Sequence, residues 1–425
     1  MPKALAVLRA RTEPLLEHPR FVTACLLLGI VLRLIWIALV DAEQVSDFGY
    51  YYQLATNLAS GKGYSLNGIP TGYWPIGYPA FLSALFYLTG PVALVGKLAN
   101  VLLSTGVIYV TYLLSKRWFQ SELAARVALC ILCFLPNHIA YSSLLSSEIL
   151  FIFLVALGVL LLDAAENRTN QLLLCGLVWG LATLTKPQAI VLPIIILFTL
   201  SNSRKAFVKS GLIIYGLVIL LAAPWAARNY YVMGAAALSN TGGINLLDGN
   251  NPYATGSHNY SEDVNELLGD LRMTPSDYPL DAKEAPRDAR AREIAVDYIL
   301  HNPGRTLALL PRKFIVLFLS DTEGVYYSLG MMAAGDDRPV VLAARALAEL
   351  YYGFVLVLFL VSLPAILKPA IRAQLTGLAI VSFLIVLYLA LFGNARYHFP
   401  MMPWLAIYAG IGAQRLLCSR EGELV

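Results

Sequence analysis

A succession of long apolar runs limits this chain to folds that cross a lipid bilayer many times. Several of these runs approach or exceed the roughly 20 residues that an α-helix needs to span the hydrocarbon core. Hydrophobic residues make up 58% of the sequence and charged residues 14%, whereas a soluble protein carries about a quarter charged residues. We therefore expect an all-α integral membrane protein. Its modest net charge of +4 argues against a nucleic-acid partner.

The positions of the runs predict about ten membrane spans in a multi-span helical bundle. The expected spans are 21–40, 92–115, 122–140, 149–165, 171–186, 188–200, 208–226, 342–366, 373–392 and 399–417. The apolar run 171–200 is divided at Lys186-Pro187, because proline disrupts a helix interior. An undivided helix would also place the basic residues that follow it on the outer side. The apolar segment 311–321 is too short to span, and we expect it to be interfacial or re-entrant.

The distribution of charge orients the bundle. Basic residues such as Arg9 and Arg11 precede the first run, and the positive-inside rule places such residues in the cytoplasm. Ten spans would return the C-terminus to the same side. The long polar segment carries eleven acidic and five basic residues between 229 and 304, which favours the outer side. We expect a multi-pass membrane protein with both termini cytoplasmic.

Three regions are predicted from this map. The first, 1–228, is an N-terminal transmembrane module that includes a first outer loop at 41–91. The second, 229–310, is a long extracytoplasmic loop with a helix at about 286–302. The third, 311–425, holds the C-terminal transmembrane helices. Juxtamembrane helices are expected on the outer face.

Asp47 opens an amphipathic segment just outside the first span. Tyr50 or Tyr51, Leu54 and Leu58 recur at helical spacing, so 47–60 is predicted to be a helix along the outer interface with its tyrosines at headgroup level. A carboxylate at this boundary could take a proton from a substrate hydroxyl. The alternative is a helix cap, because an acid at a helix start accepts backbone hydrogen bonds and suits the helix dipole.

A second acid and three basic side chains are predicted on the same face, and a lysine is a further candidate. Glu148 directly precedes an apolar run, where a carboxylate is unusual, although it too could cap a helix. Arg228, Arg396 and His398 stand at outer span boundaries, against the usual bias of positive charge. Arginine can hold a phosphate with two hydrogen bonds, and the alternative is an anchor at the membrane interface. Lys186 stands at the predicted helix break, where it could face outward or form an ion pair inside the bundle.

The order of these features resembles a known family. They are Asp47, Trp74-Pro75-Ile76-Gly77-Tyr78-Pro79, Ser146-Ser147-Glu148, Thr185-Lys186-Pro187, Pro224-Trp225-x-x-Arg228-Asn229 and Arg396-Tyr397-x-x-Pro400. Together they resemble the GT-C glycosyltransferases of the protein O-mannosyltransferase and lipid A aminoarabinose transferase type. The segment Ser239 through Gly256 is especially similar to bacterial members of the family-39 type.

The resemblance implies an inverting transfer of a monosaccharide from a polyprenyl-phosphate donor to a lipid, glycan or protein hydroxyl, on the outer face of a bacterial plasma membrane. Asp47 would be the general base and Glu148 the second acid. The donor phosphate would be held by Arg228, Arg396, Lys186 and His398. The substrate pocket would be lined by Tyr50, Tyr51, Trp74, Tyr78, Asn250 and Tyr397. Apart from the donor no cofactor is implied, and two nearby acids are compatible with a divalent metal ion without requiring one.

Two other functions stay open from the sequence. A secondary transporter or lipid flippase would show paired broken helices and internal repeats, which this sequence lacks. A glycan ligase or polymerase with a pyrophosphate-linked donor would place Arg and His in a large outer loop. The chain also has Trp74-Pro75-Ile76 where aminoarabinose transferases carry a lysine near a Pro-Pro block, which leaves the acceptor open.

Overall fold

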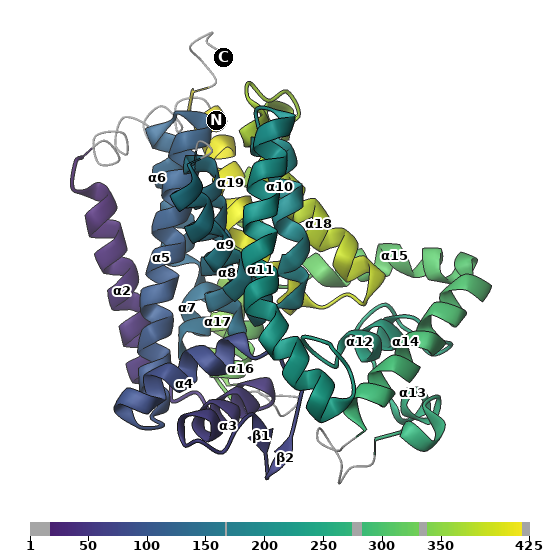
Figure 1. Cartoon of the computed structure of the whole chain (residues 1–425). Helices are drawn as coiled ribbons and strands as arrows, with labels where there is room; N and C mark the ends of the chain where they lie inside the picture. The colour runs from purple at the N-terminus through teal and green to yellow at the C-terminus, as the bar shows by residue number, and fades with distance from the viewer. Residues whose placement is uncertain (1–17, 166–167, 274–282, 331–337, 419–425) are drawn as a thin grey trace.

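The computed structural model describes residues 18–165, 168–273, 283–330 and 338–418, which form a helical bundle with a layer of shorter helices at one end (Figure 1). The basic residues 1–17, which helped to orient the bundle, lie outside the described residues. The expected all-α membrane fold is confirmed.

Each of the ten predicted spans overlaps a helix of the bundle. These helices are α2 (Phe21–Leu39), α5 (Ala93–Phe119), α6 (Glu122–Phe134), α8 (Ser147–Ala164), α9 (Thr169–Thr185), α10 (Leu192–Leu200), α11 (Arg204–Met233), α17 (Pro339–Ile366), α18 (Thr376–Ala390) and α19 (Met402–Cys418). Within the described ranges, six helical segments are long and apolar enough to cross a membrane, or seven if a pair bent by 54° after Phe134 is one span. Helix α9 and the segment Pro187–Leu200 are apolar but shorter.

The remaining elements are short and join or cover the bundle helices. They are α3 (Asp47–Ala59), β1 (Ser65–Leu66), β2 (Ile69–Pro70), α4 (Gly77–Thr89), α7 (Pro136–Ala140), η1 (Tyr141–Ser143), η2 (Pro187–Val191), α12 (Gly242–Gly249), α13 (Glu262–Glu266), η3 (Gly269–Leu271), α14 (Glu284–His301), α15 (Pro303–Phe318), α16 (Glu323–Ser328), η4 (Arg372–Leu375) and η5 (Ala395–Met401). Strands β1 and β2 form an antiparallel hairpin in which Ser65 pairs with Pro70.

The two helices predicted between the spans are confirmed. The predicted helix at 47–60 is α3, and the one at 286–302 is α14. Most of the short apolar segment 311–321 belongs to α15, which exposes Leu307 and Ile315 and is followed by the exposed Leu319. Helices α12 to α15 lie to one side of the bundle, while α3, α4 and the hairpin lie beneath it (Figure 1).

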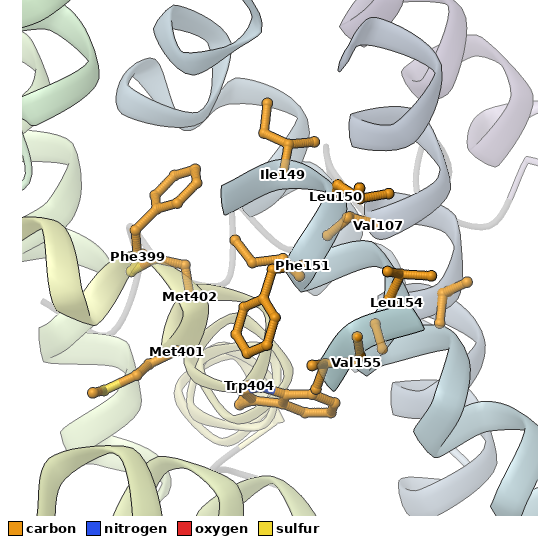
Figure 2. Close-up of a cluster of buried hydrophobic side chains, with 14 of the residues drawn as sticks. Val107, Ile149, Leu150, Phe151, Leu154, Val155, Phe399, Met401, Met402 and Trp404 are labelled. Carbon is orange, nitrogen blue, oxygen red and sulfur yellow. The ribbon is translucent and has the colours of Figure 1, made fainter. Parts of the chain in front are cut away.

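Tight packing between α8 and the 399–404 segment positions two charged residues. Phe151 of α8 is 1% exposed and lies beside Trp404 and Met402 (Figure 2). In a bilayer, lipid tails are as apolar as the core, so close van der Waals packing rather than hydrophobic transfer holds such helices together. This packing fixes the start of α8, which carries Glu148, relative to η5, which carries Arg396.

The predicted break at Lys186-Pro187 is confirmed, and it lies against the start of α4. Helix α9 ends at Thr185, and the backbone of Lys186 is extended, with φ −144° and ψ 113°. Gly77 allows the close approach, because a Cβ atom there would lie 2.5 Å from the backbone nitrogen of Thr185. The conformation therefore places the segment after Trp74-Pro75 next to Lys186.

Candidate active site

Four charged side chains from distant parts of the chain meet in one network. Nη1 of Arg396 donates to Oδ2 of Asp47 at 2.9 Å, and its Nε donates to Oε1 of Glu148 at 2.7 Å. Nζ of Lys186 donates to the same Glu148 oxygen at 3.2 Å. Four of the six predicted charged site residues thus lie together, contributed by α3, α8, η5 and the break after α9.

The network is buried at one end and open at the other. The side chain of Glu148 is 3% exposed, that of Arg396 16% and that of Asp47 34%. A buried carboxylate is stable only when cations or hydrogen bonds compensate its lost hydration. Burial disfavours the charged form of Arg396, but the negative charges of Glu148 and Asp47 outweigh it and hold the pKa of Arg396 well above its ordinary value. The guanidinium is therefore a permanent cation between the two acids.

Asp47 does not serve as a helix cap. Its second oxygen, Oδ1, accepts a hydrogen bond from Nε1 of Trp74 at 3.0 Å. The residue at the N-cap of α3, Ser46, makes no capping hydrogen bond with its side chain. Because both carboxylate oxygens bind other segments, Asp47 is held rigidly while part of it stays accessible.

Aromatic rings surround the network. Tyr50 packs on Trp74, with ring centroids 4.7 Å apart, and Tyr51 meets Tyr78 edge to face at 5.3 Å. The hydroxyl of Tyr51 lies 3.5 Å from Oγ of Ser147, beside Glu148. These four tyrosine and tryptophan residues, all predicted to line a substrate pocket, thus lie beside the acidic pair.

Two further aromatic residues flank Arg396. Tyr397, a predicted pocket residue, stacks on Tyr388 with centroids 4.3 Å apart. Phe48 lies under the Arg396 guanidinium, 5.3 Å from ring centroid to Cζ. Phe48 was not predicted as a site residue. In an amphipathic helix, the sequence alone does not distinguish a phenylalanine that contacts a cation from one that packs in the core.

Arg228 lies outside the charge network and fastens the first outer loop. Its guanidinium donates to the backbone oxygens of Thr71 at 2.6 Å and Tyr64 at 3.0 Å. It also lies 5.0 Å from the ring centroid of Trp225. The structure therefore shows Arg228 joining α11 to the β1–β2 hairpin region.

His398 and Asn250 also occupy separate polar sites. Nδ1 of His398 donates to the Leu317 backbone oxygen at 2.8 Å, and Nε2 lies 3.0 Å from Oδ1 of Asp321. Both ring nitrogens are thus engaged with buried partners. Asn250 is buried too, and its Oδ1 accepts a hydrogen bond from Nζ of Lys313 at 3.1 Å. Asp321 was not predicted from the sequence. An acidic residue at the end of the apolar segment 311–321 could have indicated a buried polar partner.

An apolar groove begins beside the charge network. It has a volume of about 560 Å³ and lies between α4, α8, α9 and α11. Six of its lining residues are Ile76, Ala80, Leu150, Leu181, Thr185 and Pro224. Since Thr185 precedes Lys186 and Leu150 follows Glu148 by two residues, one end of the groove adjoins the charged groups.

In the described part of the chain, no group of three or more His, Cys, Asp or Glu side chains is arranged to hold a metal ion. Asp47 and Glu148 are instead bridged by Arg396. The arrangement can orient a hydroxyl group at Asp47 and compensate an anion at Arg396 and Lys186.

Known proteins share parts of this sequence and its fold. Residues 74–227 match the family model described as dolichyl-phosphate-mannose-protein mannosyltransferase. No curated protein sequence matches the chain. The oligosaccharyltransferase of Archaeoglobus fulgidus in its apo form is similar, with 14% identity and a TM-score of 0.53 over 93% of this chain and 50% of that one.

Two more solved structures are similar. The same oligosaccharyltransferase tethered to an acceptor peptide shares 13% identity, with a TM-score of 0.51 over 93% of this chain and 49% of that one. ArnT from Cupriavidus metallidurans bound to undecaprenyl phosphate shares 14% identity, with a TM-score of 0.43 over 95% of this chain and 79% of that one. The chain spans about half the length of the oligosaccharyltransferase. The family match over residues 74–227 and the shared fold support the resemblance to GT-C glycosyltransferases that was drawn from the sequence.

Proposed function

We propose that this protein transfers a monosaccharide from a polyprenyl-phosphate donor to a hydroxyl group of a lipid, glycan or protein, on the extracytoplasmic face of the bacterial plasma membrane. The observation that carries the proposal is the Asp47–Arg396–Glu148–Lys186 network at the end of an apolar groove. A polyprenyl-phosphate sugar combines the same two features, an anionic head and a long apolar tail. The family model matched by residues 74–227 is also named for a dolichyl-phosphate sugar.

Asp47 is the proposed general base. As the acceptor oxygen attacks the anomeric carbon, the bond to the donor phosphate breaks and the acceptor proton passes to Asp47. Displacement from the opposite side inverts the configuration. Trp74 and Arg396 hold the carboxylate in one orientation, and positioning of this kind supports proton transfer.

Arg396 and Lys186 are the proposed partners of the leaving phosphate. The two hydrogen bonds from Arg396 to the acids use Nη1 and Nε, and no described residue accepts a hydrogen bond from its Nη2. An incoming phosphate oxygen can therefore bind Nη2 without displacing either acid. Cations placed where negative charge develops lower the barrier to reaction. Glu148 keeps both cations in place between turnovers.

The apolar groove is the proposed site of the isoprenoid tail. Replacing Ala80 with phenylalanine should fill part of the groove and weaken binding of undecaprenyl phosphate about tenfold, since each buried methylene contributes about 0.8 kcal/mol. Binding of a soluble short-chain isoprenyl phosphate should change much less. Both affinities can be measured by intrinsic fluorescence in detergent.

The control for this change is Ala289→Phe, on the exposed face of α14 and outside the groove. It should leave both affinities unchanged. Equal weakening of the long and short ligands by Ala80→Phe would contradict the placement of the tail in this groove.

The function itself is tested with purified protein and undecaprenyl-phosphate monosaccharides. Release of undecaprenyl phosphate together with glycosylation of an added hydroxyl acceptor is the expected result. A ligase or polymerase would instead require a pyrophosphate-linked donor. A transporter would move the lipid-linked sugar across proteoliposome membranes without cleaving it. Either of those outcomes would overturn the proposed transfer reaction.

A further inference from the structure

A second acid–base pair, Asp248 and His258, lies in the long outer loop. Oδ2 of Asp248, near the end of α12, lies 2.5 Å from Nδ1 of His258. The other carboxylate oxygen, Oδ1, accepts the backbone N–H of Asn259 at 2.9 Å. The Asp248 side chain is 2% exposed whereas that of His258 is 62% exposed. The acid is thus buried and engaged at both oxygens, while the imidazole faces outward.

The loop that carries His258 is attached to the segment that carries Arg396. The backbone N–H of Gly393 donates to the Gly256 oxygen at 2.9 Å. The His258 ring packs on Phe392 at 5.4 Å between centroids, and Phe392 packs on Tyr397 at 5.3 Å. Through these contacts His258 adjoins the wall of the proposed active site.

The environment of His258 favours its protonated form. The hydrogen bond that Nδ1–H of His258 donates to Asp248 is the largest influence and raises the pKa of His258. Burial opposes this, and the charges of Asp248 and Asp47 raise the pKa further. Asp47, which exerts the smallest of these influences, belongs to α3 and is the same acid that binds Arg396. The side chain of Arg312, from α15, packs against the same loop, 3.2 Å from the position of a Cβ atom at Gly256.

The protonation state of His258 determines what its Nε2 atom can bind. Nδ1 faces the Asp248 carboxylate, so in neutral His258 the proton stays on Nδ1 and Nε2 is only an acceptor. In the protonated form Nε2–H becomes a charged donor. No described residue forms a hydrogen bond with Nε2. The ring is 62% exposed, so an anion beside it can accept a hydrogen bond from Nε2–H directly.

The four charges of the central network cancel, since two acids face two cations. A phosphate monoester that leaves the sugar gains negative charge beyond what this neutral set compensates. We propose that His258, held by Asp248, binds the phosphate of the polyprenyl donor through Nε2–H and makes phosphate binding dependent on pH. This inference rests on the proposed function, and it names a cation that no sequence feature had indicated.

The test is the affinity of the full-length protein for undecaprenyl phosphate in detergent between pH 6 and 9, measured by native mass spectrometry or fluorescence. Because the pKa of His258 is raised, its imidazole is protonated below about pH 6.5, the ordinary pKa of histidine. It loses the proton as the pH rises through the higher pKa in the folded protein. Wild-type affinity should therefore fall severalfold across this range. His258→Gln should bind about tenfold more weakly at pH 6, with a flatter pH profile, and His258→Arg should restore binding at pH 9.

The matched control is His301→Gln, because His301 forms a similar pair with Asp297 at 3.1 Å on the exposed side of α14. It should change neither the affinity nor the pH profile. Phosphatidic acid, a phosphate monoester without an isoprenoid tail, should bind weakly to every variant. Strong His258-dependent binding of phosphatidic acid would assign the site to membrane lipid headgroups and overturn the proposal.

Two other outcomes have different meanings. If His258→Gln binds like wild type at every pH while Arg396→Gln loses binding, the role of His258 is wrong and the proposed function stands. If the wild-type protein binds no undecaprenyl phosphate, both the role of His258 and the proposed donor are wrong. Thermal denaturation of each variant verifies that it is folded.

Discussion

Replacing Arg396 with leucine should both destabilise the protein and abolish sugar transfer. Arg396 bonds to Glu148 at 2.7 Å and to Asp47 at 2.9 Å, and the Glu148 side chain is 3% exposed. Removing one partner of a buried ion pair leaves an uncompensated charge, which typically costs about 3–5 kcal/mol. Lys186 still faces Glu148 at 3.2 Å, which places the expected loss near the lower end of that range. The measurement is the thermal denaturation midpoint in detergent, together with donor cleavage.

The control is Arg290→Leu, which removes an exposed cation paired with Glu293 on α14. Exposed pairs contribute about 0–1 kcal/mol, so stability and activity should stay close to those of wild type. The double variant Arg396→Leu/Glu148→Leu should recover stability, since it removes the stranded buried charge, but it should not recover activity. Wild-type stability of Arg396→Leu would show that the network does not hold η5 against α8.

The local parts of this site were predictable from sequence because local rules determine them. Helical spacing placed a helix after Asp47, and proline placed a break after Lys186, and both are confirmed. The chemical character of Asp47 could not be separated from capping by spacing alone. The partners decide it, since Oδ1 binds Trp74 and Oδ2 binds Arg396.

The positions of the remaining cations depended on contacts between distant segments. Arg228 and Arg396 look alike in sequence, each near the boundary of a predicted span. Packing directs Arg228 to backbone oxygens of the first outer loop and Arg396 to the two acids. His398 is two residues from Arg396, yet it is buried against Asp321 instead. Nothing in local spacing separates these outcomes.

The division of the chain into three regions stays a prediction, and one contact bears on it. Oε1 of Glu284, in α14, accepts a hydrogen bond from the Thr71 hydroxyl at 2.7 Å, and Oε2 accepts the Gly72 N–H at 2.9 Å. Segments assigned to the first outer loop and to the long outer loop are therefore bonded to each other. Such a link would couple movements of the long loop to the loop that carries Trp74.

Asp47→Asn should lose most sugar transfer while keeping the fold and the binding of the polyprenyl phosphate. The amide oxygen can still accept from Trp74, and Arg396 keeps its bond to Glu148, so the network loses one charge that is partly exposed. An amide side chain cannot take the proton from the hydroxyl group of the sugar acceptor at neutral pH. General base catalysis typically contributes 10²–10⁴-fold, so donor cleavage should fall by about that factor.

The matched control is Asp41→Asn, which removes a fully exposed acid six residues earlier, 4.0 Å from Lys97, and should leave cleavage unchanged. Asp47→Glu should keep partial activity, since it retains a base but shifts it by one methylene. If Asp47 served only to hold Arg396, Asp47→Asn would give a different pattern. It would bind undecaprenyl phosphate more weakly and melt at a lower temperature, while turnover at saturating donor would stay nearly intact. Binding, stability and turnover are measured on the same variants, so the two roles of Asp47 give opposite results. Only a loss of turnover with intact binding supports Asp47 as the group that deprotonates the acceptor.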